Sequence, residues 1–201
     1  MIWREEQALC RRFDKELLRI EPWGADSFRI RATQNNRFRE EGEEASLSAL
    51  LPAGRQEAEI EIDEANDRGR IRNGNLVCEI CSTGRLIFRK SDGKVLLEEY
   101  DKNRFRRRNY EQDPDSALEI PSRQYEPHLG TNDYMLTAHF AAKEGERFYG
   151  MGQYGLPFLN LKGCKLELAQ RNSQVSVPFL ISSEGYGFLW NNPAIGYASF
   201  G

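Results

Sequence analysis

The sequence has 201 residues, of which 39% are hydrophobic and 11% aromatic, and this composition excludes wholesale disorder because it can build a packed core. No apolar run reaches the roughly 18 residues of a membrane-spanning helix, and residues 1–6 lack the pattern of a secretory signal, so we expect no membrane partner and a cytoplasmic location. The formal net charge of −3 provides no long-range attraction for nucleic acid, which is not expected as a partner.

Short segments of alternating apolar and polar residues predict an all-β protein. In chain order they cover residues 18–20, 28–32, 58–62, 76–80, 134–140, 164–168 and 186–190. Such alternation places one face of a strand in a core and the other toward water. Turn-forming residues, such as Asn73-Gly74, separate the segments. Many short strands with almost no helical pattern predict an antiparallel β-sandwich, and the strand–helix alternation of a (β/α)8 barrel is absent.

Other stretches depart from this pattern. Residues 40–52 begin with an acidic run and predict a loop with one helical turn, whereas the polar residues 101–127 predict a long connection between strands. The first dozen residues fit either a short helix or a first strand. The basic cluster at 103–110 has the composition of a nucleic-acid contact, but acidic neighbours such as Asp101 and Glu111 favour a solvated loop.

The chain contains four cysteines, which are Cys10, Cys78, Cys81 and Cys164. Cys78 and Cys81 form a lone C-x-x-C motif, for which half a zinc site and a redox pair are the functional interpretations. Residues three apart on a strand face opposite ways, and the sequence offers no second Cys or His pair at ligand spacing. We therefore expect packed, reduced thiols of a cytosolic protein and no metal site.

Four blocks of sequence together resemble a known family. They are LLRIEPWG at 17–24, FYGMGQ at 148–153, LKG at 161–163 leading to RN at 171–172, and GYGFLWNNP at 185–193. Their order and spacing are similar to those in the N-terminal β-sandwich domain of glycoside hydrolase family 31, the α-glucosidases and α-xylosidases. The resemblance extends from about residue 16 to residue 201.

This resemblance implies a galactose mutarotase-like supersandwich in which residues 1–201 form a single N-terminal domain, truncated before a (β/α)8 catalytic barrel. The implied parent enzyme is a retaining α-glycosidase that hydrolyses α-glucosides or α-xylosides and needs no metal or organic cofactor. The domain would pack on its own C-terminal barrel, support the barrel fold and lend one loop to the substrate pocket. Its implied partners are that barrel and an α-linked oligosaccharide or glycoside.

The chain itself is expected to hold no catalytic residue. A retaining glycosidase uses two carboxyl groups roughly 5–5.5 Å apart, and in family 31 both are aspartates of the barrel, the nucleophile in a Trp-x-Asp-Met-type motif. Trp3, Trp23 and Trp190 are followed by Arg, Gly and Asn, so the motif is missing. Galactose mutarotases use two histidines for acid–base work, but His128 and His139 are only eleven residues apart, far closer than in mutarotases, and we interpret them as ordinary surface or half-buried residues.

The resemblance assigns substrate binding to Arg171 and Asn172. In the family, an Arg followed by Asp or Asn at this place helps to form the +1 subsite, on the leaving-group side of the sugar pocket. An amide side chain can donate to and accept from sugar hydroxyls. Asparagine in place of the commoner aspartate keeps this hydrogen bonding and removes the charge, which bears on the preferred leaving-group sugar. The alternative is a polar loop tip without a ligand.

We interpret four glycines as structural, because glycine allows close packing or a positive φ: Gly150, Gly152, Gly185 and Gly187. Tyr186, Phe188 and Trp190 alternate along one predicted strand and should anchor the core or the interface with the barrel, with sugar stacking as the less favoured alternative. Two other functions remain open for the whole chain. A stand-alone carbohydrate-binding module would need aromatics exposed on a face, and a scaffolding domain would need a large exposed apolar patch.

Overall fold

The computed structural model describes residues 1–38, 49–51, 56–102 and 120–201. The basic cluster at 103–110 and most of the acidic segment 40–52 lie outside the described residues. The chain forms two compact units. Unit 1 comprises the described residues of Met1–Phe38 and Ala53–Ala141, and unit 2 those of Arg39–Pro52 and Ala142–Gly201. The single domain over residues 1–201 stays a prediction.

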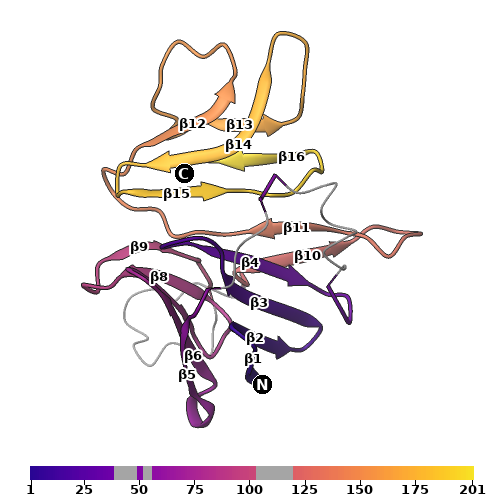
Figure 1. Cartoon of the computed structure of the whole chain (residues 1–201). Coiled ribbons are helices and arrows are strands. Elements are labelled where there is room, and N and C mark those ends of the chain that lie inside the picture. Colours follow the sequence, from indigo (N-terminus) through magenta and orange to yellow (C-terminus); the bar gives the residue numbers. More distant parts are fainter. Residues whose placement is uncertain (39–48, 52–55, 103–119) are drawn as a thin grey trace, which may run out of the picture. The chain divides into compact units, whose positions relative to one another are not determined.

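Unit 1 contains two antiparallel sheets and a two-stranded ribbon (Figure 1). The four-stranded sheet has the order β1-β2-β3-β4, with the bounds Ile2–Glu5, Ala8–Phe13, Glu16–Pro22 and Phe28–Thr33. The five-stranded sheet has the order β5-β6-β7-β8-β9, with the bounds Glu59–Asp63, Arg68–Asn73, Leu76–Ile80, Leu86–Lys90 and Val95–Glu98, and a single 3-10 turn, Glu64–Asn66, joins its first two strands. The ribbon pairs β10, Arg123–Pro127, with β11, Tyr134–Ala138.

The core of unit 1 lies between its two sheets. The inward side chains of β1, β2 and β3 meet those of β6, β7 and β8, and the buried members are Ile2, Leu9, Leu18, Ile20, Ile71, Cys78, Ile80 and Leu86. Alternating residues supply this layer from each strand, as Leu18 and Ile20 do in β3. The predicted all-β antiparallel sandwich is therefore confirmed.

The prediction of a connection over 101–127 is wrong for its last part, because Arg123–Pro127 form strand β10. The strand carries no apolar alternation and ends in a proline, so its sequence lacks the usual signal. The first dozen residues, which fitted a helix or a strand, form the two strands β1 and β2, paired from Ile2↔Arg11 to Glu5↔Ala8.

A buried ionic network fastens β10 inside unit 1. Arg123 donates to both carboxylate oxygens of Glu16, at 2.7 and 3.0 Å, and to Glu99. Glu99 also accepts from the main-chain N–H of Leu86 at 2.9 Å. Burial raises the pKa of Glu99, although Arg123 opposes the shift. Burial also acts to raise the pKa of Glu16, but the hydrogen bonds and charge of Arg123 outweigh it, and this pKa lies below its ordinary value.

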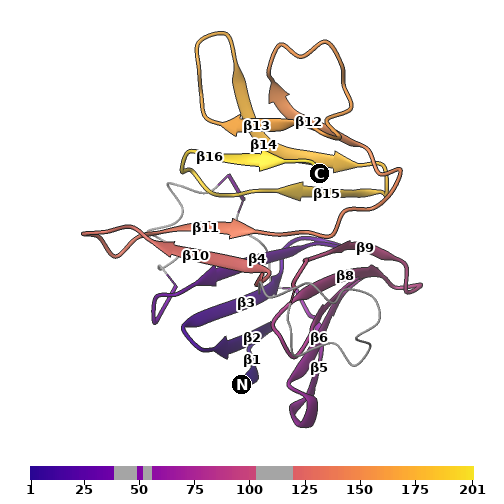
Figure 2. The same cartoon turned by 180° about the vertical axis from the view of Figure 1, so that it is seen from behind.

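Unit 2 contains a three-stranded sheet of order β12-β14-β15 and a two-stranded sheet of β13 and β16 (Figure 2). The strands β12 to β16 have the bounds Phe148–Gln153, Lys165–Leu168, Val175–Ser182, Tyr186–Leu189 and Gly196–Ser199. Its core is smaller, and the buried members are Met151, Leu161, Leu166 and Phe200. Unit 2 carries the residues that the sequence assigned to substrate.

All four cysteines are free thiols. Cys78 is fully buried on β7, and this burial raises the pKa of its thiol. Burial likewise raises the pKa of Cys10 to about 11. These protonated, packed thiols fit the predicted structural role. Within the described ranges, no helix has the length and hydropathy needed to cross a membrane.

Candidate functional site

Arg171 and Asn172 lie in a tight turn between β13 and β14. The turn spans residues 171–174, and the N–H of Gln174 donates to the main-chain oxygen of Arg171 at 3.1 Å. Ser173 takes a left-handed conformation, with φ of +66°. Arg171, Asn172 and Ser173 are all exposed. The two residues that the sequence assigned to substrate therefore sit together at an exposed tip.

Gln170 fixes the base of this turn. Its side-chain amide donates to the main-chain oxygen of Ser176 at 2.7 Å and accepts from the main-chain N–H of the same residue at 3.1 Å. One side chain thus pairs with both backbone groups of a β14 residue, as a neighbouring strand would. The turn is held against β14 on either side of residues 171–174.

Glu167 holds the side chain of Arg171. The Arg171 Nε and Nη2 atoms donate to the two Glu167 carboxylate oxygens at 3.0 and 2.8 Å, a bidentate pair. The hydrogen bond from Arg171 lowers the pKa of Glu167, and the same bond raises the pKa of Arg171. The pair uses two of the five guanidinium N–H groups, so Arg171 keeps donors for a further acceptor. Its side chain is 55% exposed and open to one.

Tyr197 on β16 stands directly across the strands from Glu167. It is 66% exposed, and the Lys165 ammonium lies 4.8 Å from its ring centroid. Because paired residues of an antiparallel ladder share a face, Tyr197, Glu167 and Lys165 project from the same side of the β13–β16 sheet. An exposed aromatic ring beside hydrogen-bonding side chains is a surface suited to a sugar.

Tyr154 connects this site with the rest of unit 2. Its hydroxyl donates to the main-chain oxygen of Glu167 at 2.9 Å and lies 2.7 Å from Ser176 Oγ. Tyr154 follows β12 directly, so this contact ties the end of β12 to β13 and β14. The base of the Arg171 turn is therefore held by two side chains, those of Tyr154 and Gln170.

Strand β12 reaches Tyr154 through a β-bulge at residues 150–152. Gly150 and Gly152 have φ of +103° and +96°. A Cβ atom at Gly152 would stand 2.1 Å from the main-chain oxygen of Val175, and one at Gly150 would stand 2.6 Å from that of Phe179. Both the conformation and the close approach require glycine, as the sequence predicted. The bulge turns Met151 into the core.

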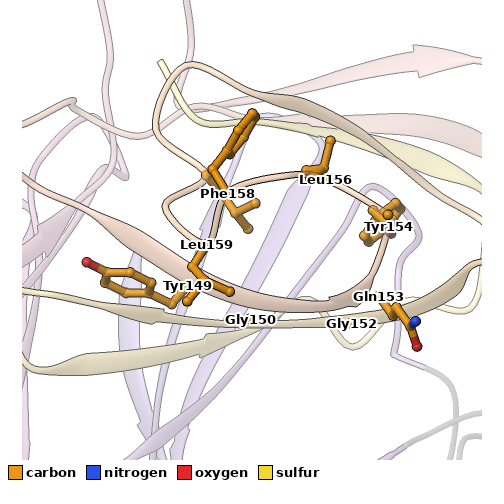
Figure 3. Close-up of a pocket in the computed structure, with 10 residues that line it drawn as sticks. Tyr149, Gly150, Gly152, Gln153, Tyr154, Leu156, Phe158 and Leu159 are labelled. Carbon is orange, nitrogen blue, oxygen red and sulfur yellow. The ribbon is translucent and has the colours of Figure 1, made fainter.

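A pocket of about 480 Å³ lies between β12 and the loop that follows it (Figure 3). Its walls are mostly apolar, with Leu156, Phe158 and Leu159 from the loop, and glycine backbone lines the strand side. No charged side chain lines it. Figure 3 shows the Gln153 side chain extending away from the loop. The pocket lacks the convergent polar groups of a sugar site, so the Arg171 turn stays the candidate site.

The aromatic residues of β15 face inward. Tyr186 and Phe188 pair with Ser182 and Leu180 on the inner face of β14, and Leu180 packs on the unit 2 core. The Phe188 and Trp190 rings stack with their centroids 6.4 Å apart. The Tyr186 hydroxyl donates to the buried Glu146 carboxylate at 2.8 Å. These side chains support unit 2, which agrees with the predicted anchoring role.

The model of the glycosyl hydrolase 31 N-terminal galactose mutarotase-like domain matches residues 17–198. The chain belongs to this family. The match covers both units, and it runs from β3 to β16. The family resemblance of the sequence blocks is thereby confirmed.

Relatives of this family 31 N-domain include longer proteins named as glycosidases. The uncharacterized family 31 glucosidase ORF2 of Pseudescherichia vulneris is 47% identical over 198 residues, which are 94% of this chain and 35% of that protein. Alpha-xylosidase A of Aspergillus niger is 30% identical over 92% of this chain and 25% of its own length. A GH31 alpha-xylosidase from a soil metagenome, solved with xylose, is similar with a TM-score of 0.88 and 42% identity, over 100% of this chain and 29% of its own. The chain thus spans about a third or less of these proteins.

The histidines of the family 31 N-domain lie in unit 1. His139 Nε2 is 3.2 Å from Gln124 Oε1, and His128 is exposed in the turn between β10 and β11. Within the described part of the chain, no group of three or more His, Cys, Asp or Glu side chains has an arrangement that could hold a metal ion. The arrangement that remains for ligand contact is the exposed turn.

Sequence reasoning missed two members of this site, Glu167 as the partner of Arg171 and Tyr197. The four-residue spacing of Glu167 and Arg171 is a helical signal, and here the two residues lie on a strand and in the turn after it. Tyr197 is 26 positions from Arg171 in the chain, and only the pairing of β13 with β16 brings it near. The alternation Gly-Tyr-Ala-Ser at 196–199 could have identified β16 as a strand with an exposed tyrosine.

Proposed function

We propose that this chain is the accessory N-terminal domain of a retaining α-glycosidase that hydrolyses α-xylosides or α-glucosides. The membership of the family 31 N-domain supports the reaction class, and the alpha-xylosidases among the relatives favour α-xylosides. The observation that carries the proposal is the exposed turn in which Glu167 presents the Arg171 guanidinium beside Asn172. In the complete enzyme this turn contacts the leaving-group sugar.

The chemistry of the turn suits that role. Arg171 donates hydrogen bonds through the N–H groups that Glu167 leaves available, and the bidentate pair with Glu167 restricts the conformations of its side chain before substrate arrives. Asn172 can both donate to and accept from hydroxyls, which a sugar presents in both senses. Tyr197 offers a ring face next to them. A leaving group without hydroxyls gains nothing from these donors, so the site selects sugars.

The catalytic carboxylates belong to the barrel in this proposal, and the partner of the domain is that barrel in the same polypeptide. The reaction of two carboxyl groups needs no metal or organic cofactor. Four free cysteines and protonated, buried thiols at Cys10 and Cys78 support a reducing, cytoplasmic location.

Kinetics of the full-length polypeptide test the proposal with two kinds of substrate. Arg171→Ala should lower kcat/KM for an α-linked disaccharide roughly tenfold to a hundredfold, the loss expected for a charged hydrogen bond. The same variant should change hydrolysis of nitrophenyl α-xyloside and α-glucoside little, because the nitrophenyl leaving group carries no sugar hydroxyls for Arg171 to bind. Asn172→Asp should alter the preference among disaccharides.

Arg72→Ala is the matched control, because Arg72 is an exposed arginine that is also paired with a glutamate, Glu59. If Arg171→Ala behaves like Arg72→Ala on disaccharides, the turn does not contact substrate. Activity on neither sugar by the full-length protein would contradict the reaction class. A carbohydrate-binding module would be indicated by sugar affinity of the 201-residue chain alone, measured by calorimetry and lost in Arg171→Ala.

A further inference from the structure

The outward face of the two-stranded β13–β16 sheet is polar (Figure 2). On the opposite face, residues such as Leu166 pack in the core of unit 2. The outward residues alternate with these, and they face each other across the strands as the pairs Lys165↔Ser199 and Glu167↔Tyr197. All of them are exposed except Glu167, which is half-buried. One aromatic ring therefore stands among hydrogen-bonding side chains on this face.

The Tyr197 ring lies next to the site that holds Arg171. The Lys165 ammonium is 4.8 Å from the ring centroid, a cation–π contact that restricts the ring. Tyr197 is nevertheless 66% exposed, so much of its ring surface is open. Its cross-strand partner Glu167 is the residue that binds Arg171. The pKa of Arg171 is raised first by Glu167 and to a smaller extent by the Tyr197 phenol, which places that phenol near the guanidinium.

Tyr197 differs from the tyrosines that support unit 2. The Tyr154 hydroxyl donates to the main chain of Glu167, and the Tyr186 hydroxyl donates to the buried Glu146 carboxylate. Both of these side chains are half-buried, and their hydroxyl groups join neighbouring strands or loops. Tyr197 projects from the outward face of its sheet, where its ring adds nothing to the core. A role in the fold therefore does not account for an aromatic residue at this position.

We propose that Tyr197 forms a second sugar subsite, which binds the saccharide unit next to the leaving-group sugar. This inference rests on the proposed function, because it takes Arg171 and Asn172 as the contacts of the leaving-group sugar itself. Neighbouring strands lie about 4.8 Å apart, so Tyr197 is one such step from Glu167 and the arginine that it holds. The preferred substrate is then an α-linked trisaccharide or longer chain.

The chemistry of this face suits a neutral sugar. The apolar C–H face of a pyranose stacks on an aromatic ring, and its hydroxyls need hydrogen-bonding groups around that ring. The Lys165 ammonium is a donor, and the Ser199 hydroxyl can both donate and accept. Glu167 matches the charge of Arg171, so among these outward residues only Lys165 adds a further charge. A nucleic acid would need several cations to offset its phosphates.

Kinetics of the full-length polypeptide on sugars of two lengths test the proposal. The probes are maltose with maltotriose, and α-xylosyl-glucose with α-xylosyl-cellobiose, because the longer sugar of each pair extends the leaving group by one glucose. The wild type should have the higher kcat/KM for the longer sugar. Tyr197→Ala should lower the ratio of kcat/KM for the longer sugar to that for the shorter one roughly threefold to tenfold, the effect expected for one aromatic contact. Tyr197→Phe keeps the ring and should keep the ratio.

Tyr100→Ala is the matched control, because Tyr100 is an exposed tyrosine of unit 1, and it should leave the ratio unchanged. A wild type with equal kcat/KM for both lengths would overturn the proposal. So would a loss in Tyr197→Ala that is equal for both lengths, which a general disturbance of unit 2 would produce.

The failure of this inference can be told from the failure of the proposed function. If Arg171→Ala impairs disaccharide hydrolysis and Tyr197→Ala leaves the ratio unchanged, the second subsite is rejected and the proposed function stands. If Tyr197→Ala lowers the ratio and Arg171→Ala has no effect on either sugar, the Tyr197 subsite stands and the Arg171 contact is rejected.

Discussion

The two units of this chain differ in how many large apolar side chains they leave exposed. In unit 1, strands such as β3 and β6 point apolar or small residues into a core between two sheets and charged residues outward. In unit 2, strand β14 points Ser176, Pro178, Leu180 and Ser182 inward and valine, phenylalanine and isoleucine outward. Most of the large hydrophobic side chains that are exposed among the described residues lie in unit 2.

This difference shows how the same alternation can encode two kinds of surface. Unit 1 forms a core between its two sheets, and its buried arginines are ion-paired, Arg123 with Glu16 and Glu99 and Arg11 with Asp67. Unit 2 has a small core and leaves an apolar sheet face open. Burial between its two sheets therefore accounts for the strand pattern of unit 1, whereas the core of unit 2 does not account for the apolar outer residues of β14.

The largest expected effect comes from breaking the charge balance of unit 1. Arg123→Met leaves the buried Glu99 without its cation, which should lower the free energy of unfolding by about 3–5 kcal/mol. Denaturant titration measures it, and hydrogen exchange should locate the loss in unit 1. Arg85→Met, which removes a more exposed ion-paired arginine, is the control and should cost much less.

The pH dependence of Arg123→Met sharpens this test. Without Arg123, the pKa of buried Glu99 should rise further above its ordinary value of 4.5. A carboxyl group whose pKa is raised in the folded state destabilises that state at high pH and ceases to do so as the pH falls toward the unfolded value. The loss of unfolding free energy caused by Arg123→Met should therefore become smaller on acidification. A loss that became larger would contradict the role of Glu99.

A smaller effect should follow from altering the bulge of unit 2. Gly152→Ala places a Cβ atom against the main-chain oxygen of Val175, at a positive φ, and should cost about 3 kcal/mol. Gly155→Ala is the matched control, since Gly155 also has a positive φ but no atom lies within 4 Å of its added Cβ, and about 1–2 kcal/mol is expected. Thermal unfolding compares them. Equal losses would mean that the close approach to β14 does not constrain the bulge.

The smallest effect is expected on the outer edge of unit 1. Glu59 and Arg72 pair across β5 and β6 with side chains 74% and 44% exposed. A double-mutant cycle with alanine at both positions should give a coupling of about 0.2–1 kcal/mol, which decreases with added salt. A coupling as large as that of Arg123 would remove the distinction between buried and exposed ion pairs in this unit.

Sequence patterns predicted the strands whose apolar residues face the core. The alternation at 28–32, 58–62 and 76–80 corresponds to β4, β5 and β7. Strand β14 escaped prediction because Pro178 interrupts it and three consecutive apolar residues, Phe179 to Ile181, break its alternation. Pro178 has no N–H to donate to β15. Beyond the pair Phe179↔Leu189, the Trp190 N–H donates to the main-chain oxygen of Pro178 at 2.8 Å.

The candidate site was predictable only in part. The sequence blocks identified Arg171 and Asn172, and the structure places both at one exposed tip. Their role toward substrate stays a prediction. The partnership of Arg171 with Glu167 depends on the conformation of the turn, and the position of Tyr197 depends on the pairing of β13 with β16. Such contacts join residues through the fold, where spacing along the chain gives no guide.

The amide of Gln170 has a consequence for how this family can diversify. The Gln170 side chain pairs with both the N–H and the main-chain oxygen of Ser176. These two hydrogen bonds to β14 therefore involve no atom of residues 171–174. Residues 171–174 can therefore be exchanged, or lengthened by an insertion, while the ladder of unit 2 keeps its hydrogen bonds. If the turn contacts the leaving-group sugar as proposed, randomising these four positions while retaining Gln170 and Ser176 is a route to new leaving-group preferences.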